Sequence, residues 1–261
     1  MHHALNRSMM TRRKFLALGA LALPSAIGAE AALVEPTNLR TRELTLKSGG
    51  NLRFLAFTDL HYKGNARYAA EVVATINRLA PAFVTFSGDL VEDRRFAPAA
   101  LDFIRQIKSP VYGAPGNHDY WCGAPFADYE KAFAATGGAW LVDRGLVLPE
   151  HDLEIVGVGL AGMHALQPTP RTARRILLLH YPELADRLGD PTFDLILAGH
   201  SHGGQVRLPF FGALWLPWGV GRYDLGHFES KGGPLYVGSG IGTYHLPLRF
   251  NCRPEVTLVT M

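Results

Sequence analysis

Five short apolar segments of this chain each end in a polar residue that can bind a metal ion. The segment 195–198 runs into Gly199-His200-Ser201-His202, so two imidazoles two residues apart follow a buried strand. The other four segments lie upstream and end in the clusters Asp59-Leu60-His61, Gly88-Asp89, Gly116-Asn117-His118-Asp119 and His180. Carboxylate, amide and imidazole ligands without a thiolate favour Mn, Fe or Zn. We therefore expect a fold in which several strand ends converge on one metal site.

The histidines after these segments are the strongest part of the pattern. A single histidine after a strand is more often a hydrogen-bonded structural residue. Five in equivalent positions, each beside an acidic, amide or glycine residue or at a strand end, favour ligands instead. Asn117 is open to two interpretations, a turn residue or a neutral oxygen ligand. Of the other histidines, His151 and His164 are expected to be structural or on the surface, and His227 and His245 could line a cleft.

The spacing of apolar residues predicts alternating strands and helices in the first half of the body. Strands are expected at 53–57, 82–87 and 111–116, separated by helices at 66–79 and 97–107, with a further helix at 125–136. This βαβαβ order predicts crossovers within one sheet and ligands at the strand C-termini. The second half carries short strands and one clear helix at 182–188, which predicts a second, mixed or antiparallel sheet packed on the first.

The first residues are distinct from this body. Thr11-Arg12-Arg13-Lys14-Phe15-Leu16 joins a paired arginine to an uncharged stretch over 15–29, which ends in Ala29-Glu30-Ala31. These regions resemble a twin-arginine export signal with a small-x-small cleavage site. We therefore expect a signal at 1–31, a linker or N-terminal segment at 32–45, one domain at 46–261, and export to the periplasm or cell envelope. Two alternatives stay open: a cytosolic helix that begins with two arginines, and an uncleaved membrane anchor, for which the apolar run is short.

Charge and cysteine content bear on partners and redox state. Removal of residues 1–31 takes away four basic residues and one acidic residue, so the formal net charge falls from +3 to 0. Nucleic-acid binding would want clustered Lys and Arg, and no such platform is expected in the remaining chain. Cys122 and Cys252 could pair after export, but a twin-arginine substrate folds in the reducing cytosol, so we expect two free thiols.

Taken in order, the five polar clusters resemble the signature of the calcineurin-like metallophosphoesterases across the whole chain after the signal. The matching residues are Asp59-x-His61, Gly88-Asp89, Gly116-Asn117-His118-Asp119, His180 and Gly199-His200-x-His202. Later stretches are similar to a bacterial phosphodiesterase subgroup of that family: Gly203-Gly204-Gln205, Gly240-Ile241-Gly242-Thr243, Leu246-Pro247-Leu248-Arg249-Phe250 and Pro254-Glu255.

The resemblance implies a fold and a ligand set. The fold is an α/β, four-layer αββα sandwich of two mixed sheets, with two divalent or trivalent metal ions, Mn, Fe or Zn, at the strand ends. The resemblance gives the first metal Asp59, His61, Asp89 and His202, and the second Asp89, Asn117, His180 and His200. It also implies that Asp89 bridges the two ions together with a water or hydroxide, while His118 lies beside them.

Hydrolysis of a phosphodiester needs a nucleophile at neutral pH and relief of charge on the phosphoryl oxygens. Two cations about 3.5–4 Å apart supply both, because they lower the pKa of a bridging water and hold the phosphoryl group for in-line attack by hydroxide. His118 then donates a proton or hydrogen bond to the leaving group or to a phosphoryl oxygen. Asp119 either orients His118 or caps the following helix.

The segment 209–228 is unusually rich in Phe, Trp, Leu, Pro and Gly. One interpretation is a core hairpin buried under the second sheet, because large apolar residues are mostly interior. The other is a lip of the site, which would suit a lipid-bearing substrate or a membrane surface. Tyr120 and Trp121, directly after Asp119, could add an aromatic edge.

We therefore expect an exported, metal-dependent phosphohydrolase, and specifically a phosphodiesterase. Its expected partners are a phosphoester substrate, the twin-arginine export machinery and, peripherally, a membrane. One alternative is a membrane-facing hydrolase of a lipid-linked phosphate or pyrophosphate. Another is a metal-binding protein without turnover, which the complete set of ligands and the presence of His118 disfavour.

Overall fold

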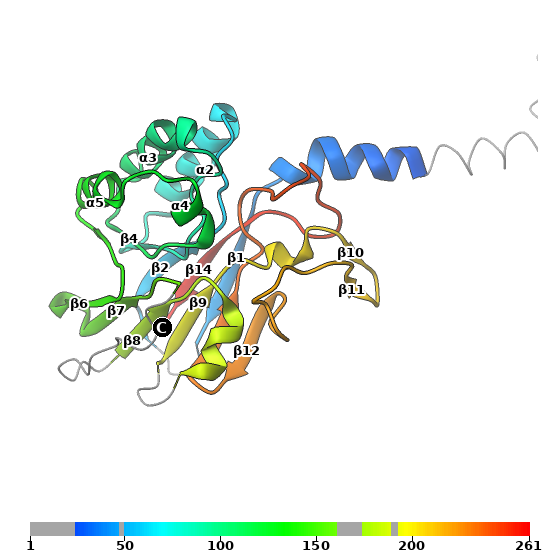
Figure 1. Cartoon of the computed structure of the whole chain (residues 1–261). Helices are drawn as coiled ribbons and strands as arrows, with labels where there is room; N and C mark the ends of the chain where they lie inside the picture. The colour runs from blue at the N-terminus through cyan, green and yellow to red at the C-terminus, as the bar shows by residue number, and fades with distance from the viewer. Residues whose placement is uncertain (1–23, 47–49, 161–173, 189–192) are drawn as a thin grey trace, which may run out of the picture.

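Two six-stranded mixed sheets form the body of the protein (Figure 1). The computed structural model describes residues 24–46, 50–160, 174–188 and 193–261. Across the first sheet the order is β1 (Arg40–Thr45), β14 (Glu255–Thr260), β2 (Arg53–Phe57), β3 (Val84–Phe86), β4 (Val111–Gly113) and β5 (Ala139–Trp140). Across the second it is β12 (Gly226–Ser230), β13 (Gly233–Val237), β9 (Leu195–Ala198), β8 (Arg174–Leu178), β7 (Leu153–Gly157) and β6 (Arg144–Leu148).

The central strands of each sheet run parallel. This holds for β2, β3 and β4 in the first sheet, and for β7, β8, β9 and β13 in the second. Parallel strands place their C-terminal ends at one edge of a sheet, so the loops after β2, β3 and β4 are neighbours. A separate two-stranded hairpin, β10 (Arg207–Leu208) with β11 (Gly212–Ala213), projects from the body (Figure 1).

Three helices cover the outer face of the first sheet: α2 (Ala66–Leu79), α3 (Ala97–Arg105) and α5 (Phe126–Ala134) (Figure 1). Helix α2 begins where the Asn65 side chain accepts a hydrogen bond from the Tyr68 backbone, and it ends at Ala80 in a left-handed conformation. Its buried residues, which include Val72 and Ile76, recur at helical spacing. The shorter helical segments are η1 (Glu30–Val34), η2 (Glu35–Thr37), η3 (Arg94–Phe96), α4 (Asn117–Trp121), η4 (Pro149–His151), η6 (Pro182–Arg187) and η7 (His202–Gly204).

Three apolar clusters separate four layers. The first packs the helices on the first sheet, where Val72 meets strand residues such as Phe86. The second joins the two sheets, with Phe54 from one and Leu197 from the other. The third covers the outer face of the second sheet and includes Ala185 of η6. This order of helix, sheet, sheet and helix confirms the predicted αββα sandwich, although the outer layer of the second sheet is a 3-10 helix in the described residues.

The N-terminal segment is part of the fold. Strand β1 lies within the segment expected to be a linker, 32–45, and pairs with β14 along its whole length. Before it, residues 24–29 are helical and lead into η1 and η2. Glu35 is buried and accepts hydrogen bonds from the backbone of Asn251 and Cys252. The ordered domain therefore begins before residue 46, and the exposed, charged character of the edge strand β1 explains why no apolar pattern indicated it.

Cys122 and Cys252 are free thiols, as predicted. The helix predicted at 182–188 is a 3-10 helix, η6. Within the ranges that the structure describes, no helix is both long and apolar enough to cross a bilayer. Residues 1–23 of the export signal predicted at 1–31 lie outside the described residues, as does His164, which falls on 161–173.

Candidate metal centre

Seven side chains from five loops come together at one place between the two sheets. The loops after β2, β3 and β4 of the first sheet and after β8 and β9 of the second supply them: Asp59, His61, Asp89, Asn117, His180, His200 and His202. All are buried except His200, which is partly exposed. The backbone N–H of His200 donates to the Asp59 carboxylate at 3.1 Å, which ties a loop of one sheet to a loop of the other. The structure thus gathers every residue that the sequence predicted as a ligand.

The backbone of these loops is held in an uncommon conformation. Five of the seven residues have φ between 43° and 66°, namely Asp59, His61, Asp89, His200 and His202. Non-glycine residues rarely adopt this region. Each instance costs about 1–3 kcal/mol and persists only where the surroundings enforce it, typically at a functional site. Gly88 has a φ of 97°, and a Cβ there would lie 2.4 Å from the backbone of Gly116. The loops are therefore strained and closely packed on one another.

The first group of ligand atoms belongs to Asp59, His61 and His202, which lie within 4.8 Å of one another. His202 Nε2 is 3.0 Å from His61 Nε2 and 3.5 Å from Asp59 Oδ1. His61 Nδ1 lies 2.6 Å from Oε2 of Glu92, and because a carboxylate only accepts, this nitrogen carries the proton. The lone pair on Nε2 of His61 therefore faces the group, as in a carboxylate–histidine–metal arrangement.

The second group belongs to Asp89, His180 and His200. His180 Nδ1 lies 2.7 Å from the carbonyl oxygen of Ser87, to which it donates, so Nε2 presents a lone pair 3.1 Å from Asp89 Oδ2. His200 Nε2 donates to the carbonyl of Trp218 at 2.7 Å, which leaves Nδ1 for the group. Nε2 of His180 and Oδ2 of Asp89 are both acceptors and lie 3.1 Å apart, so a cation or a proton is needed between them.

Asp89 lies between the two groups. Its Oδ2 is 3.1 Å from His180 Nε2 and 3.4 Å from His61 Nε2, so one carboxylate faces both. Oδ1 of Asn117 is buried without a hydrogen-bond partner among the described residues, which suits an oxygen that serves as a ligand. Carboxylates, imidazoles and one amide in two overlapping groups are a donor set that fits two cations of the Mn, Fe or Zn type.

The electrostatics of the site favour positive charge. Burial would lower the pKa of His61 and His180, but neighbouring carboxylates, Asp59 and Asp89 above all, outweigh it and raise the pKa of both to about 9. Burial likewise opposes ionisation of Asp59 and Asp89, yet the histidines hold the pKa of both well below the usual range. The carboxylates therefore stabilise positive charge at His61 and His180. Burial and the neighbouring histidines instead lower the pKa of His200, to about 4, and of His202.

His118 lies beside the two groups. Its backbone N–H donates to Asp89 Oδ1 at 2.7 Å, and its Nδ1 lies 3.3 Å from Oε2 of Glu92. Burial lowers the pKa of His118, with partial compensation from the Asp89 charge. Glu92 contacts both His61 and His118 and was not predicted as a site residue. The available signal was an acidic residue three positions after Asp89 in the same loop.

Asp119 anchors the loops of the site. Its carboxylate accepts from the backbone N–H groups of Asp89, Leu90 and Gly116 at 2.8–3.0 Å, and from the Tyr129 hydroxyl at 3.1 Å. Burial and the Asp89 charge raise its pKa to about 6, although the backbone hydrogen bonds act in the opposite direction. Asp119 lies inside α4 and accepts from the backbone N–H of Gly116 at the start of that helix, so it does not cap the following helix. Glu92, not Asp119, contacts His118.

A cavity of about 400 Å³, here called the site cavity, opens over the two groups. It is lined by His61, Asp89, Asn117, His118, Trp121, Tyr181, His200, His202, Trp215, Pro217, Trp218, Tyr244 and His245. Trp121 and His245 border it as the sequence suggested, whereas Tyr181 and Tyr244 were not foreseen. Phe210, Phe211 and Trp218 are exposed, so the first half of the segment 209–228 forms a lip. The second half fits the other interpretation, because Val220 and Tyr223 are buried and β12 begins at Gly226. His227 is exposed on the edge strand β12.

Residues 52–204, which include all seven predicted ligands, match the family described as calcineurin-like phosphoesterase. The chain belongs to this family. It is 31% identical to the metallophosphoesterase YkuE of Bacillus subtilis, over 97% of this chain and 98% of that one. It is 27% identical to the phosphodiesterase YaeI of Escherichia coli, over 97% and 100% of the two chains. A metallophosphoesterase of Campylobacter jejuni is 31% identical over 81% of this chain and 59% of its own length. The protein is therefore a phosphoester hydrolase with two metal ions as cofactors, as the sequence predicted.

Proposed function

We propose that the protein is a phosphodiesterase whose reaction takes place over Asp89. The observation that carries this proposal is the position of Asp89, whose carboxylate faces both groups of ligand atoms and also holds His118. The relative from Escherichia coli is named a phosphodiesterase, and it aligns over almost the whole of both chains. That full-length similarity supports a diester as the substrate.

Each residue has a distinct task in this proposal. One cation would be held by Asp59, His61, Asp89 and His202, and the other by Asp89, Asn117, His180 and His200. When bound, the two cations would supply a nucleophile from water at neutral pH and neutralise charge on the phosphoryl oxygens. Oε2 of Glu92 lies 3.3 Å from Nδ1 of His118 and its charge favours the imidazolium, whose Nε2–H would give the proton to the leaving oxygen.

Turnover of matched substrates tests the reaction type. The metal-stripped protein is restored with Mn, Fe or Zn and assayed with bis-(p-nitrophenyl) phosphate and with p-nitrophenyl phosphate. We expect at least one metal to restore activity, with kcat/KM for the diester roughly tenfold or more above that for the monoester. A monoester preference of the same size, or activity that survives removal of the metals, would contradict the proposal.

We also propose that the protein is exported through the twin-arginine machinery. The paired guanidinium groups of Arg12 and Arg13 are the feature that the export receptor reads, and Lys keeps the charge but not the fork. Replacement of both by Lys should therefore block export, as seen by cell fractionation. Equal amounts of variant and wild type outside the cytoplasm would remove the proposal.

The contacts of the N-terminal segment favour an uncleaved signal that stays as an anchor. Ala31, the last residue of the predicted cleavage motif, is buried, and its carbonyl accepts a hydrogen bond from the backbone of Arg249. Residues 30–34 are also helical, whereas proteolysis acts on exposed and flexible chain. The intact mass of the exported protein tests this: we expect the full N-terminus, and a chain that begins at residue 32 would contradict it.

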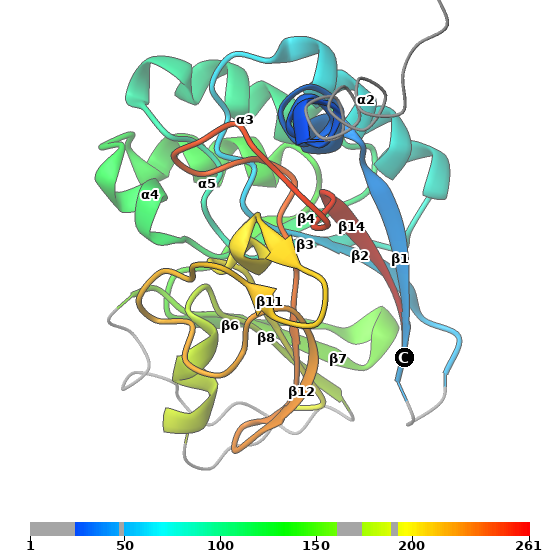
Figure 2. The same ribbon diagram turned by 90° about the vertical axis from the view of Figure 1, so that its right-hand side faces the viewer.

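A second candidate function is hydrolysis of a lipid-linked phosphate or pyrophosphate at a membrane face. One observation favours it, the exposure of large apolar side chains along the lip, with Phe210, Phe211, Trp215 and Trp218 as the largest. In Figure 2 the β10–β11 hairpin and the N-terminal helix both face the viewer, so both can approach one bilayer. Turnover of a lipid pyrophosphate in place of the aryl diester would select this candidate.

A further inference from the structure

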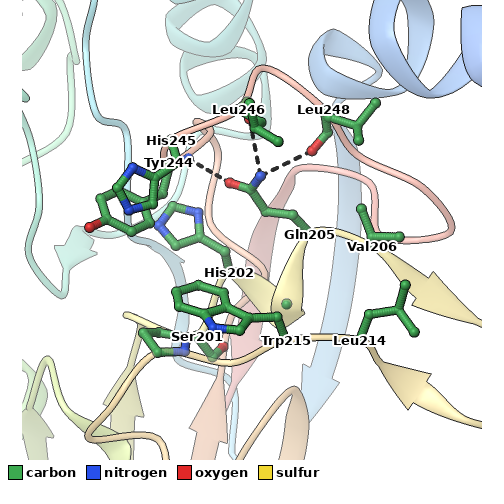
Figure 3. Close-up of a pocket in the computed structure, with 12 residues that line it drawn as sticks. Ser201, His202, Gln205, Val206, Leu214, Trp215, Tyr244, His245, Leu246 and Leu248 are labelled. Atoms are coloured by element: carbon green, nitrogen blue, oxygen red, sulfur yellow. Dashed lines mark hydrogen bonds between the residues drawn. The ribbon is translucent and has the colours of Figure 1, made fainter.

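A second and larger cavity adjoins the site cavity. Its volume is about 590 Å³, and both cavities are lined by His202, Trp215, Pro217, Tyr244 and His245. Figure 3 shows the metal-ligand candidate His202 with Tyr244 at one end of this cavity, and Val206 and Leu214 at the other. A molecule whose phosphate lies over the ligand groups can therefore extend directly into the second cavity.

The far end of this cavity is lined by apolar residues and by one polar side chain whose hydrogen-bonding atoms are already occupied. Gln205 is the one amide side chain among the described residues that line it, and its polar atoms are used within the protein. Nε2 donates to the carbonyls of Leu246 and Leu248, and Oε1 accepts from the backbone N–H of Tyr244 (Figure 3). A sugar or nucleobase placed there would lose hydrogen bonds to water and gain none, whereas a hydrocarbon chain gains from burial.

The rim of the cavity is apolar and exposed. Phe210 and Phe211 form the turn between β10 and β11, and Phe210 is fully exposed with a φ of 69°. Bulky residues rarely adopt this conformation, so the turn presents an aromatic ring to solvent at a conformational cost. The hairpin leads directly into Leu214 and Trp215, which line the cavity and are themselves more than half exposed. An apolar path thus runs from the surface to the predicted metal ligands.

We propose that this second cavity binds the hydrocarbon chain of a phosphodiester substrate. We call it the apolar cavity and define it by Gln205, Val206, Leu214, Trp215, Leu246 and Leu248. The proposal rests on the phosphodiesterase function proposed above and names its substrate class, a phosphodiester that carries an acyl or alkyl chain. Because each buried methylene adds binding energy, kcat/KM should rise with chain length until the cavity is filled.

A chain-length series tests this proposal with the metal-loaded enzyme. The substrates are alkyl p-nitrophenyl phosphates with methyl, butyl and octyl chains, each below the concentration at which it forms micelles. For wild type we expect kcat/KM to rise by about threefold per methylene from methyl to butyl. Val206→Phe fills the cavity and Leu214→Asn makes its wall polar, so each should lower the octyl-to-methyl ratio by about tenfold or more. Leu146→Asn, which replaces a partly exposed leucine on β6 that lines neither cavity, should keep the wild-type ratio.

A binding measurement without turnover separates this proposal from the proposed function. The probe is an octylphosphonate with a terminal bromine, which should quench the fluorescence of Trp215 from inside the apolar cavity. We expect quenching in wild type and in Leu146→Asn, and its loss in Val206→Phe and Trp215→Phe. A flat chain-length series, or equal series in wild type and both cavity variants, overturns the proposal while the phosphodiesterase function stands. Quenching without turnover of any diester, methyl included, overturns the function and leaves the cavity as a site for alkyl chains.

Discussion

The site cavity and the apolar cavity adjoin each other but are built in opposite ways. In the first, the candidate ligands are polar and mostly buried, and histidines such as His180 and His200 are fixed by a hydrogen bond on their other nitrogen. In the second, the lining is apolar and partly exposed, and Gln205 directs its polar atoms into the protein. Residues that perform chemistry sit at the ends of rigid strands, whereas those expected to select a substrate sit on a hairpin and a loop, which tolerate change.

Asp89→Asn should cause the largest loss of metal binding and activity, and its effect should be limited to the site cavity. The one carboxylate that faces both ligand groups becomes a weak neutral ligand, so metal and activity are lost together. The loss should exceed the roughly 100-fold that removal of an outer partner of a ligand costs. Elemental analysis and kinetics on the same sample measure it. Asp93→Asn, an exposed carboxylate in the same loop, is the control and should resemble wild type.

His118→Asn should show that His118 acts as a proton donor and not as a metal ligand. We expect near-stoichiometric metal with kcat lower by about 10²–10⁴-fold, because a general acid is removed and no ligand is. The defect should shrink on substrates whose leaving group is a weak base, since these need little protonation. Metal content and a leaving-group series measure both effects. Loss of the metals, or the same relative defect for good and poor leaving groups, would show that His118 has another role.

Glu92→Gln should have an intermediate effect. Glu92 contacts Nδ1 of both His61 and His118, so its charge positions a candidate ligand and the proposed acid at once. Loss of such a partner costs about 10–100-fold in metal affinity or activity. We expect weaker metal binding together with a steeper dependence on the leaving group, measured by metal titration and the same substrate series. An effect on stability alone would show that Glu92 has only a structural role.

Trp215→Ala and Trp218→Ala should have the smallest effects, and these should depend on the substrate. Each should raise KM more for an acylated substrate than for a small soluble one, because the side chains border the path to the ligands. Both are more than half exposed, so Tm should fall little. A large fall in Tm with no substrate preference is what a core role predicts. Thermal melts and kinetics on both substrates distinguish a role in the lip from a role in the core.

The convergence of the candidate ligands could be predicted from the sequence because each follows a strand closely. Apolar runs such as 195–198 indicated the strands, and parallel strands gather their C-terminal ends, so Asp59, Asp89 and His202 were found without knowledge of their contacts. Glu92 could not be found in this way. Its role comes from the path of a loop that returns its carboxylate to His61 and His118, and a path of this kind leaves no periodic signal.

Two other features depended on tertiary contacts. Strand β1 is an exposed edge strand with charged residues, so its pairing with β14, more than 200 residues away, had no apolar signature. The apolar cavity arises where the loop 244–248 is fixed by Gln205, which the sequence showed only as part of a motif. The exposure of the lip was also undecided until the structure placed Phe210 and Phe211 at a turn outside both sheets.

The central claim is that one carboxylate joins two metal sites at this edge of the sandwich. Anomalous diffraction from crystals grown with Mn tests it directly. We predict two peaks about 3.5–4 Å apart on either side of Asp89, with His61 and His202 at one and His180 and His200 at the other. A single peak, or two peaks of which either lies out of reach of Asp89, would contradict the account.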